Sequence, residues 1–75
     1  MSVRTIKVTE DNKIIFGGEE TGLQFPRAAV EDAVKYHGRN IWPHVINAIL
    51  KELDGKYNLT NDERLLGRLA LAEVA

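Results

Sequence analysis

The spacing of apolar residues changes at Pro26, and this change constrains the fold more than any other feature of the chain. Before Pro26, apolar and polar residues alternate over short runs separated by turn-forming residues, which is typical of antiparallel strands. After Pro26, apolar residues recur every three or four positions, which is typical of amphipathic helices. The sequence therefore predicts an α+β fold in a single domain, residues 1–75, with an N-terminal β-hairpin or three-stranded antiparallel meander in residues 1–25 followed by three α-helices in residues 26–75.

Short apolar runs define the predicted strands. They are residues 3–8, residues 14–16 and residues 23–25, of which the last is either a third strand or an extended lead-in to the first helix. In the first run Ile6 and Val8 share one face, because successive side chains of a strand point to opposite sides. Turn-forming residues separate the runs at 10–13 and at 17–22.

Start and stop signals divide the remainder into three helices. Gly38 is a natural C-terminal stop for the first helix. Asn40 is predicted to cap the second helix, which ends at residues 54–55. Thr60 and Glu63 have the spacing of a capping box, and they begin a third helix that runs to the C-terminus.

The third helix is apolar around much of its circumference. From residue 65 to residue 75 the charged residues are Arg68 and Glu73, so this helix must be buried on more than one side. It is either the central helix of a monomer core or a self-association helix. Gly67 in mid-helix costs about 1 kcal/mol relative to alanine, a cost usually tolerated where another backbone approaches closely.

The small size of the chain favours the second interpretation. Seventy-five residues without a cysteine bury a small core and have no disulfide to stabilise it. We therefore expect a homo-oligomer. The predicted oligomer interface consists of Leu65, Leu66, Gly67, Leu69, Ala70 and Val74.

The stretch from Tyr36 to His44 gathers the only tryptophan, both histidines and one of the two prolines on either side of the predicted helix break. Trp42 also begins the apolar stripe of the second helix, so we expect its ring to pack inward and its rim to stay exposed. Tryptophan, tyrosine and arginine are enriched at interface hot spots. The predicted partner-binding residues are Tyr36, His37, Arg39, Trp42 and His44.

Catalysis and metal binding are not expected. The absence of cysteine excludes disulfides, thiolate metal sites and cysteine nucleophiles. His37 and His44 are separated by the helix break, and no third ligand lies at a suitable spacing. No hydroxyl group stands in a nucleophile motif, and no phosphate-binding loop is present. We expect no enzyme activity, no metal and no cofactor.

Nucleic-acid binding is the alternative hypothesis. Ten lysines and arginines stand against eleven aspartates and glutamates, so the basic excess typical of nucleic-acid binders is missing. A helix-turn-helix around Gly38 fails because Pro43 would fall inside the recognition helix. What remains is a regulator that binds nucleic acid through its N-terminal hairpin, using Arg4, Lys7 and Lys13.

A local resemblance is carried by residues 32–34, Asn40, residues 42–44 and Ile49, about a quarter of the chain. These residues look like a segment of the Ocr antirestriction family of podophages. Ocr proteins imitate DNA with a densely acidic surface, which this chain does not share. The resemblance implies a small phage-type protein that binds and blocks another molecule.

The function predicted from the sequence is a small non-enzymatic module that binds or inhibits another protein and acts as a homo-oligomer. No apolar run approaches the roughly 18 residues that a membrane span needs, and the N-terminus does not have the pattern of a signal peptide. We expect a soluble, cytoplasmic protein whose partner is another protein.

Overall fold

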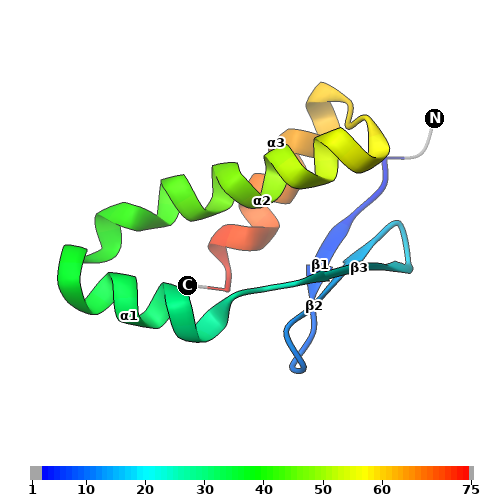
Figure 1. Ribbon diagram of the computed structural model, residues 1–75. Coiled ribbons are helices and arrows are strands. Elements are labelled where there is room, and N and C mark those ends of the chain that lie inside the picture. The colour runs from blue at the N-terminus through cyan, green and yellow to red at the C-terminus, as the bar shows by residue number, and fades with distance from the viewer. Residues whose placement is uncertain (1–2, 75) are drawn as a thin grey trace.

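The computed structural model describes residues 3–74 and confirms the α+β fold (Figure 1). Its elements are β1 (Ile6–Val8), β2 (Lys13–Phe16), β3 (Glu19–Gln24), α1 (Arg27–His37), the short 3-10 helix η1 (Arg39–Ile41), α2 (Trp42–Tyr57) and α3 (Asn61–Ala72). The strands pair antiparallel in the order β1-β2-β3. The N-terminal region is thus a three-stranded meander, and residues 23–24 belong to its third strand.

The second hairpin is tighter than the sequence suggested. Its turn consists of Gly17 and Gly18, at φ 60° and 83°, the left-handed conformations that a two-residue hairpin turn of type I′ requires. Phe16 pairs directly with Glu19, so the prediction of a turn as far as Gly22 was wrong. Gly22, at φ 81°, lies inside β3 near a register shift, and a glycine at a bulge has the same sequence signature as a glycine in a turn.

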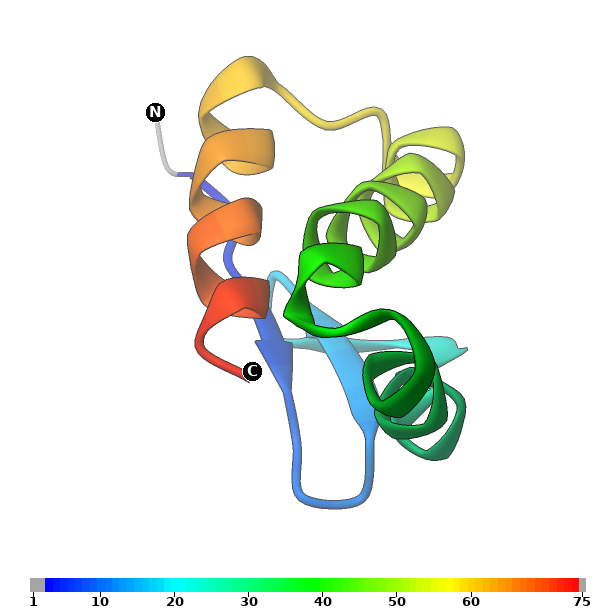
Figure 2. The same cartoon turned by 90° about the vertical axis from the view of Figure 1, so that its left-hand side faces the viewer.

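The core lies between one face of the sheet and the helices α2 and α3 (Figures 1 and 2). Its buried residues are Ile6, Ile14, Phe16, Phe25, Val30, Ile46, Ile49, Leu50, Leu53, Leu59 and Leu71. To this cluster α1 supplies Val30, whereas the neighbouring Ala29 is exposed. As a result α1 projects beyond the sheet and runs back beside the start of α2 (Figure 1).

Both ends of α2 differ from the prediction. Asn40 lies within η1 and does not cap α2, whose N-cap is Ile41 without a side-chain hydrogen bond. Pro43 does occupy the first turn, as its missing N–H allows. At the other end α2 continues past Gly55 and stops where Asn58 adopts the left-handed conformation, at φ 58°. Asparagine tolerates this conformation better than most residues, so it can replace glycine as the stop.

The predicted capping box at the start of α3 is confirmed. The Glu63 N–H donates to Thr60 Oγ1 at 3.1 Å, and the Thr60 N–H donates to Glu63 Oε1 at 2.9 Å. The helix ends at Ala72, and Ala75, to which it was predicted to run, lies outside the described residues. Within residues 3–74, no helix combines the length and the apolar character required to cross a membrane.

Candidate functional site

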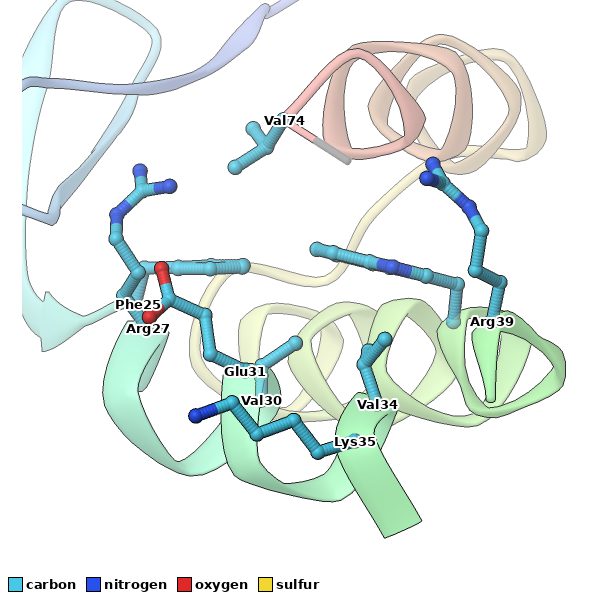
Figure 3. A pocket seen from close by; sticks show the side chains of 9 residues that line it. Phe25, Arg27, Val30, Glu31, Val34, Lys35, Arg39 and Val74 are labelled. Carbon is cyan, nitrogen blue, oxygen red and sulfur yellow. The ribbon is translucent and has the colours of Figure 1, made fainter. Parts of the chain in front are cut away.

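A pocket of about 410 Å³ opens between α1, the start of α2 and the segment that follows α3 (Figure 3). This volume lies within the range of ligand pockets, roughly 300–1,000 Å³. The residues that line it are Phe25, Arg27, Val30, Glu31, Val34, Lys35, Arg39, Trp42 and Val74. They come from segments far apart in the sequence, and the pocket exists because α1 projects beyond the sheet.

Two aromatic rings form the floor of the pocket. Phe25 joins β3 to α1 and is buried, and Trp42 is the first residue of α2 and is half-buried. Their ring centroids lie 6.2 Å apart with 16° between the planes, which places them in an offset arrangement favourable for aromatic pairs. Buried Val30 and half-buried Val34 from α1 complete the apolar part of the lining.

The rim of the pocket is mostly cationic. It carries Arg27, Lys35 and Arg39 against one carboxylate, that of Glu31. Arg27 is held in place, because its Nε donates to Asn12 Oδ1 at 2.6 Å and its guanidinium lies 5.3 Å from the Phe25 ring centroid. Lys35 and Arg39 are exposed, and neither takes part in an ion pair within residues 3–74. The rim can therefore accept negative charge from a ligand.

The predicted partner-binding residues are only partly brought together. Arg39 and Trp42 line the pocket. Tyr36, His37 and His44 are exposed outside the lining, and Tyr36 is 87% exposed. The pocket thus contains two of the five, and the other three stay a prediction about the surface around the α1–α2 junction.

Most of the lining residues carry no functional signal in the sequence. Phe25 ends a predicted strand or lead-in, Arg27 lies at the start of the first predicted helix, and Val74 belongs to the predicted oligomer interface. The signal that could have found part of the pocket is the spacing of Arg27, Glu31 and Lys35, which places them on one side of a helix. Glu31 and Lys35 have the (i, i+4) spacing of a helical ion pair, but no ion pair joins them among the described residues.

The predicted oligomer interface divides between two sides of α3. Leu65, Leu66 and Leu69 are exposed, at 58%, 43% and 58%. Gly67 is buried in the core of its own chain, and Ala70 and Val74 are partly buried. The helix is therefore covered on one side and open on the other, so it is not the central helix of a core.

Gly67 does mark a close approach, but to side chains and not to another backbone. A Cβ at this position would overlap Ile6 Cδ1 and lie 3.0 Å from Leu50 Cδ2. Because Ile6 belongs to β1 and Leu50 to α2, the glycine allows strand and helix to pack against α3 at once.

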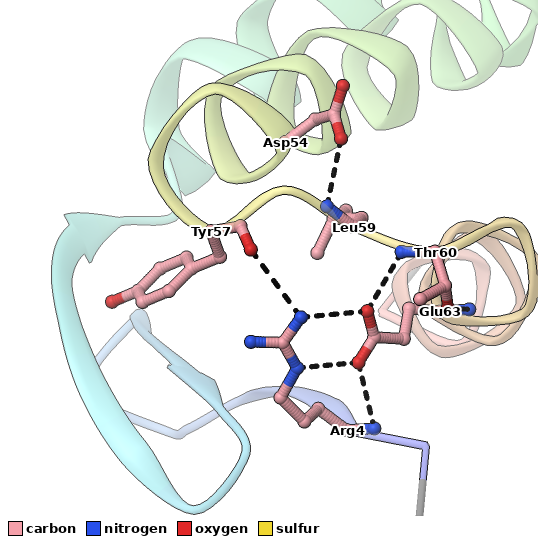
Figure 4. Close-up of polar contacts among 6 residues, drawn as sticks. All are labelled: Arg4, Asp54, Tyr57, Leu59, Thr60 and Glu63. Atoms are coloured by element: carbon pink, nitrogen blue, oxygen red, sulfur yellow. Dashed lines mark hydrogen bonds and ion pairs between the residues drawn. The ribbon is translucent and has the colours of Figure 1, made fainter. Parts of the chain in front are cut away.

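A two-contact ion pair lies at the other end of α3, where Arg4 meets Glu63 (Figure 4). Arg4 Nε donates to Glu63 Oε2 at 2.6 Å, and Nη2 donates to Oε1 at 3.0 Å. The Arg4 guanidinium also lies 4.6 Å from the Phe16 ring centroid. Hydrogen bonds from Arg4, and then from the Thr60 N–H, lower the pKa of Glu63 to about 2.

This pair serves the fold. Glu63 is buried and completes the capping box, so the ion pair fastens the N-terminal segment to the start of α3. Val74, which lines the pocket, follows Glu63 by eleven residues, or about 16 Å along a helix. The ion pair is therefore far from the pocket. A perturbed pKa can mark a catalytic group, but here its cause is structural and remote from the pocket.

Most basic side chains of the N-terminal region already pair with carboxylates of the same chain. Arg4 is paired with Glu63, and Lys13 Nζ lies 3.3 Å from Glu20 Oε1. Lys7 remains exposed. One uncommitted cation provides little of the phosphate-neutralising charge that nucleic-acid binding needs.

Within residues 3–74, no three metal-ligating side chains of histidine, cysteine, aspartate or glutamate are grouped to hold an ion. No protein-family model, no curated protein and no solved structure matches the chain. The function is therefore inferred from the chemistry of the pocket and of the exposed helix face.

Proposed function

We propose that this chain is a small, non-enzymatic, cytoplasmic module that binds or inhibits another protein. In this proposal the pocket captures a segment of the partner that carries an apolar or aromatic side chain flanked by carboxylates. The observation that carries the proposal is the combination of an aromatic floor, formed by Phe25 and Trp42, with a rim of three cations against one carboxylate.

The chemistry of each part supports this kind of partner. The half-buried Trp42 ring, packed beside buried Phe25, offers apolar contact area, and binding hot spots concentrate where such area becomes shielded from water. Exposed lysine and arginine at the rim add attraction for carboxylates and speed association. A partner segment with an apolar anchor between acidic residues satisfies both parts at once.

Self-association is the second part of the proposal. The exposed leucines of α3 lie on the side of the helix that faces away from the core, whereas Val74 packs toward the core and the pocket. A homo-oligomer formed through the leucine side would leave the pocket of each copy accessible. Two pockets in one particle would then raise the apparent affinity for a partner with repeated segments.

The pocket proposal is tested with a defined probe. The probe is a capped hexapeptide in which a leucine–phenylalanine pair is flanked on each side by two acidic residues, and binding is followed by the fluorescence of Trp42, the only tryptophan. Lys35→Glu and Arg39→Glu are made singly and together. Since an exposed ion pair contributes about 0.2–1 kcal/mol, each reversal should weaken binding up to about fivefold, and the double variant up to about 25-fold.

Lys51→Glu is the matched control, because Lys51 is exposed on α2 and is not part of the pocket. It should bind the probe as the unmodified chain does. If all variants bind equally, or if a basic version of the peptide binds as well as the acidic one, the proposal fails. A gel shift with duplex DNA that survives about 200 mM salt would favour the hairpin-based regulator instead.

A further inference from the structure

The outer side of α3 carries an apolar stripe with a regular repeat. Leu65, Leu69 and Ala72 are exposed and are spaced by four and then three residues. This is the seven-residue spacing of positions that face a second helix in a coiled coil. The stripe lies opposite Gly67 and Leu71, which are buried against the core, so it is available to another molecule.

We propose that a second copy of this chain occupies the stripe, with the two α3 helices side by side and parallel about a two-fold axis. This inference rests on the self-association part of the proposed function and does not depend on what the pocket binds.

The charges beside the stripe select the parallel direction. At 100° per residue, Arg68 lies on one flank of the stripe and Glu73 on the other, five residues later. Parallel two-fold pairing brings opposite flanks together, so Arg68 of each copy meets Glu73 of the other. The same five-residue offset joins charged flanking positions across parallel coiled coils.

Antiparallel pairing about the middle of the stripe would bring like charges together. It joins equal flanks, so Glu73 of each copy would approach Asp62 of the other. Arg64, on the flank of Arg68, is bonded to Asp54 and Asn61 of its own chain and offers Arg68 no partner. Arg68 remains able to pair between copies, because it is exposed and uses only Nη1 for its bond to Asn47 Oδ1, at 2.6 Å. A guanidinium has further N–H groups to donate.

The interface is small. The exposed parts of Leu65, Leu66 and Leu69 amount to about one and a half leucine side chains per copy, well below the roughly 800 Å² per partner of a stable complex. Asp62 extends the stripe at the start of α3. Parallel pairing places the Asp62 carboxylates of the two copies near each other, and they repel. We therefore expect a weak, reversible dimer that Asp62→Asn strengthens by removing this repulsion.

Because the chain contains no cysteine, single cysteines report the geometry directly. Ala72→Cys and Asp62→Cys are exposed substitutions at opposite ends of the stripe. In the parallel dimer each variant forms a disulfide with itself, at a rate about tenfold or more above that of Ala28→Cys, an exposed control on α1. In an antiparallel dimer only a mixture of the two variants would cross-link, because like positions then lie about 15 Å apart along the axis.

Sedimentation of the unmodified chain accompanies the cross-linking. A dimer population that rises with concentration up to about 1 mM, together with self-cross-linking at both positions, supports the proposal. Dimerisation without self-cross-linking overturns the parallel arrangement but leaves self-association standing. A chain that is monomeric at about 1 mM overturns both.

The charge pair has its own test. Arg68→Glu and Glu73→Arg should each weaken the dimer several-fold, and the double exchange should restore it. Asn47→Ala removes the intrachain partner of Arg68 without changing charge and should leave dimerisation intact. If the doubly exchanged variant dimerises as weakly as the single variants, Arg68 and Glu73 do not meet between copies.

Discussion

Replacing Gly67 by alanine tests the packing of β1 and α2 against α3. In an ordinary helix this exchange stabilises by about 1 kcal/mol, because glycine loses more backbone freedom on folding. Here the new Cβ overlaps Ile6 Cδ1 and lies 3.0 Å from Leu50 Cδ2. Ile6 and Leu50 are each only 4% exposed, so neither methyl group has open space to move into.

Overpacking of this kind costs about 1–3 kcal/mol. Since the overlapping atoms are side-chain ends, we place the cost near 2 kcal/mol, which exceeds the gain in helix propensity. The net expectation is a loss of about 1 kcal/mol in the free energy of unfolding, or roughly 4–8 °C in Tm for a domain of this size. Urea denaturation followed by circular dichroism measures it.

Gly55→Ala is the matched control, because Gly55 is also helical and its added Cβ has nothing within 4 Å. It should stabilise by up to about 1 kcal/mol. Ile6→Val removes the overlapping methyl group, so Gly67→Ala should become nearly neutral in that background, with a coupling of about 1–2 kcal/mol. If Gly67→Ala stabilises as much as Gly55→Ala, the close approach of β1 to α3 is wrong.

Two further predictions concern the start of α3. The pKa of Glu63 is lowered from 4.5 to about 2 in the folded state, so its contribution to stability is present above about pH 5 and is lost as the pH falls toward 2. Acid titrations of Tm should show a smaller loss in Glu63→Gln than in the unmodified chain, and equal losses would contradict the Arg4–Glu63 pair. Thr60→Ala removes the N-cap acceptor and should lower the free energy of unfolding by about 1 kcal/mol in urea denaturation, whereas an unchanged value would mean that the capping box contributes nothing.

Local signals in the sequence predicted much of the fold. The capping box of Thr60 and Glu63, the stop at Gly38 and the apolar stripe of α2 depend on residues near one another in the chain, and all three are present. The wrong predictions concern residue types that fit two different backbone conformations. Gly22 marks a bulge instead of a turn, and Asn58 ends a helix that Gly55 was expected to end.

The pocket could not be predicted in the same way. Phe25, Trp42 and Val74 meet only because α1 folds back along α2 and the end of α3 arrives beside them. The sequence showed that α3 is apolar on several sides, but not which side the core covers. That choice depends on Gly67, whose missing side chain admits Ile6 and Leu50 and so turns Leu65 and Leu69 outward.

A two-dimensional NMR titration of the ¹⁵N-labelled chain with the acidic hexapeptide and with its basic counterpart shows whether the pocket selects acidic segments. We expect the acidic peptide to shift the single tryptophan indole signal, from Trp42, together with the backbone amides of residues 30–39, and the basic peptide to leave these signals unchanged. Equal shifts from both peptides, or acidic-peptide shifts confined to residues outside the pocket, would contradict the proposed function of the pocket.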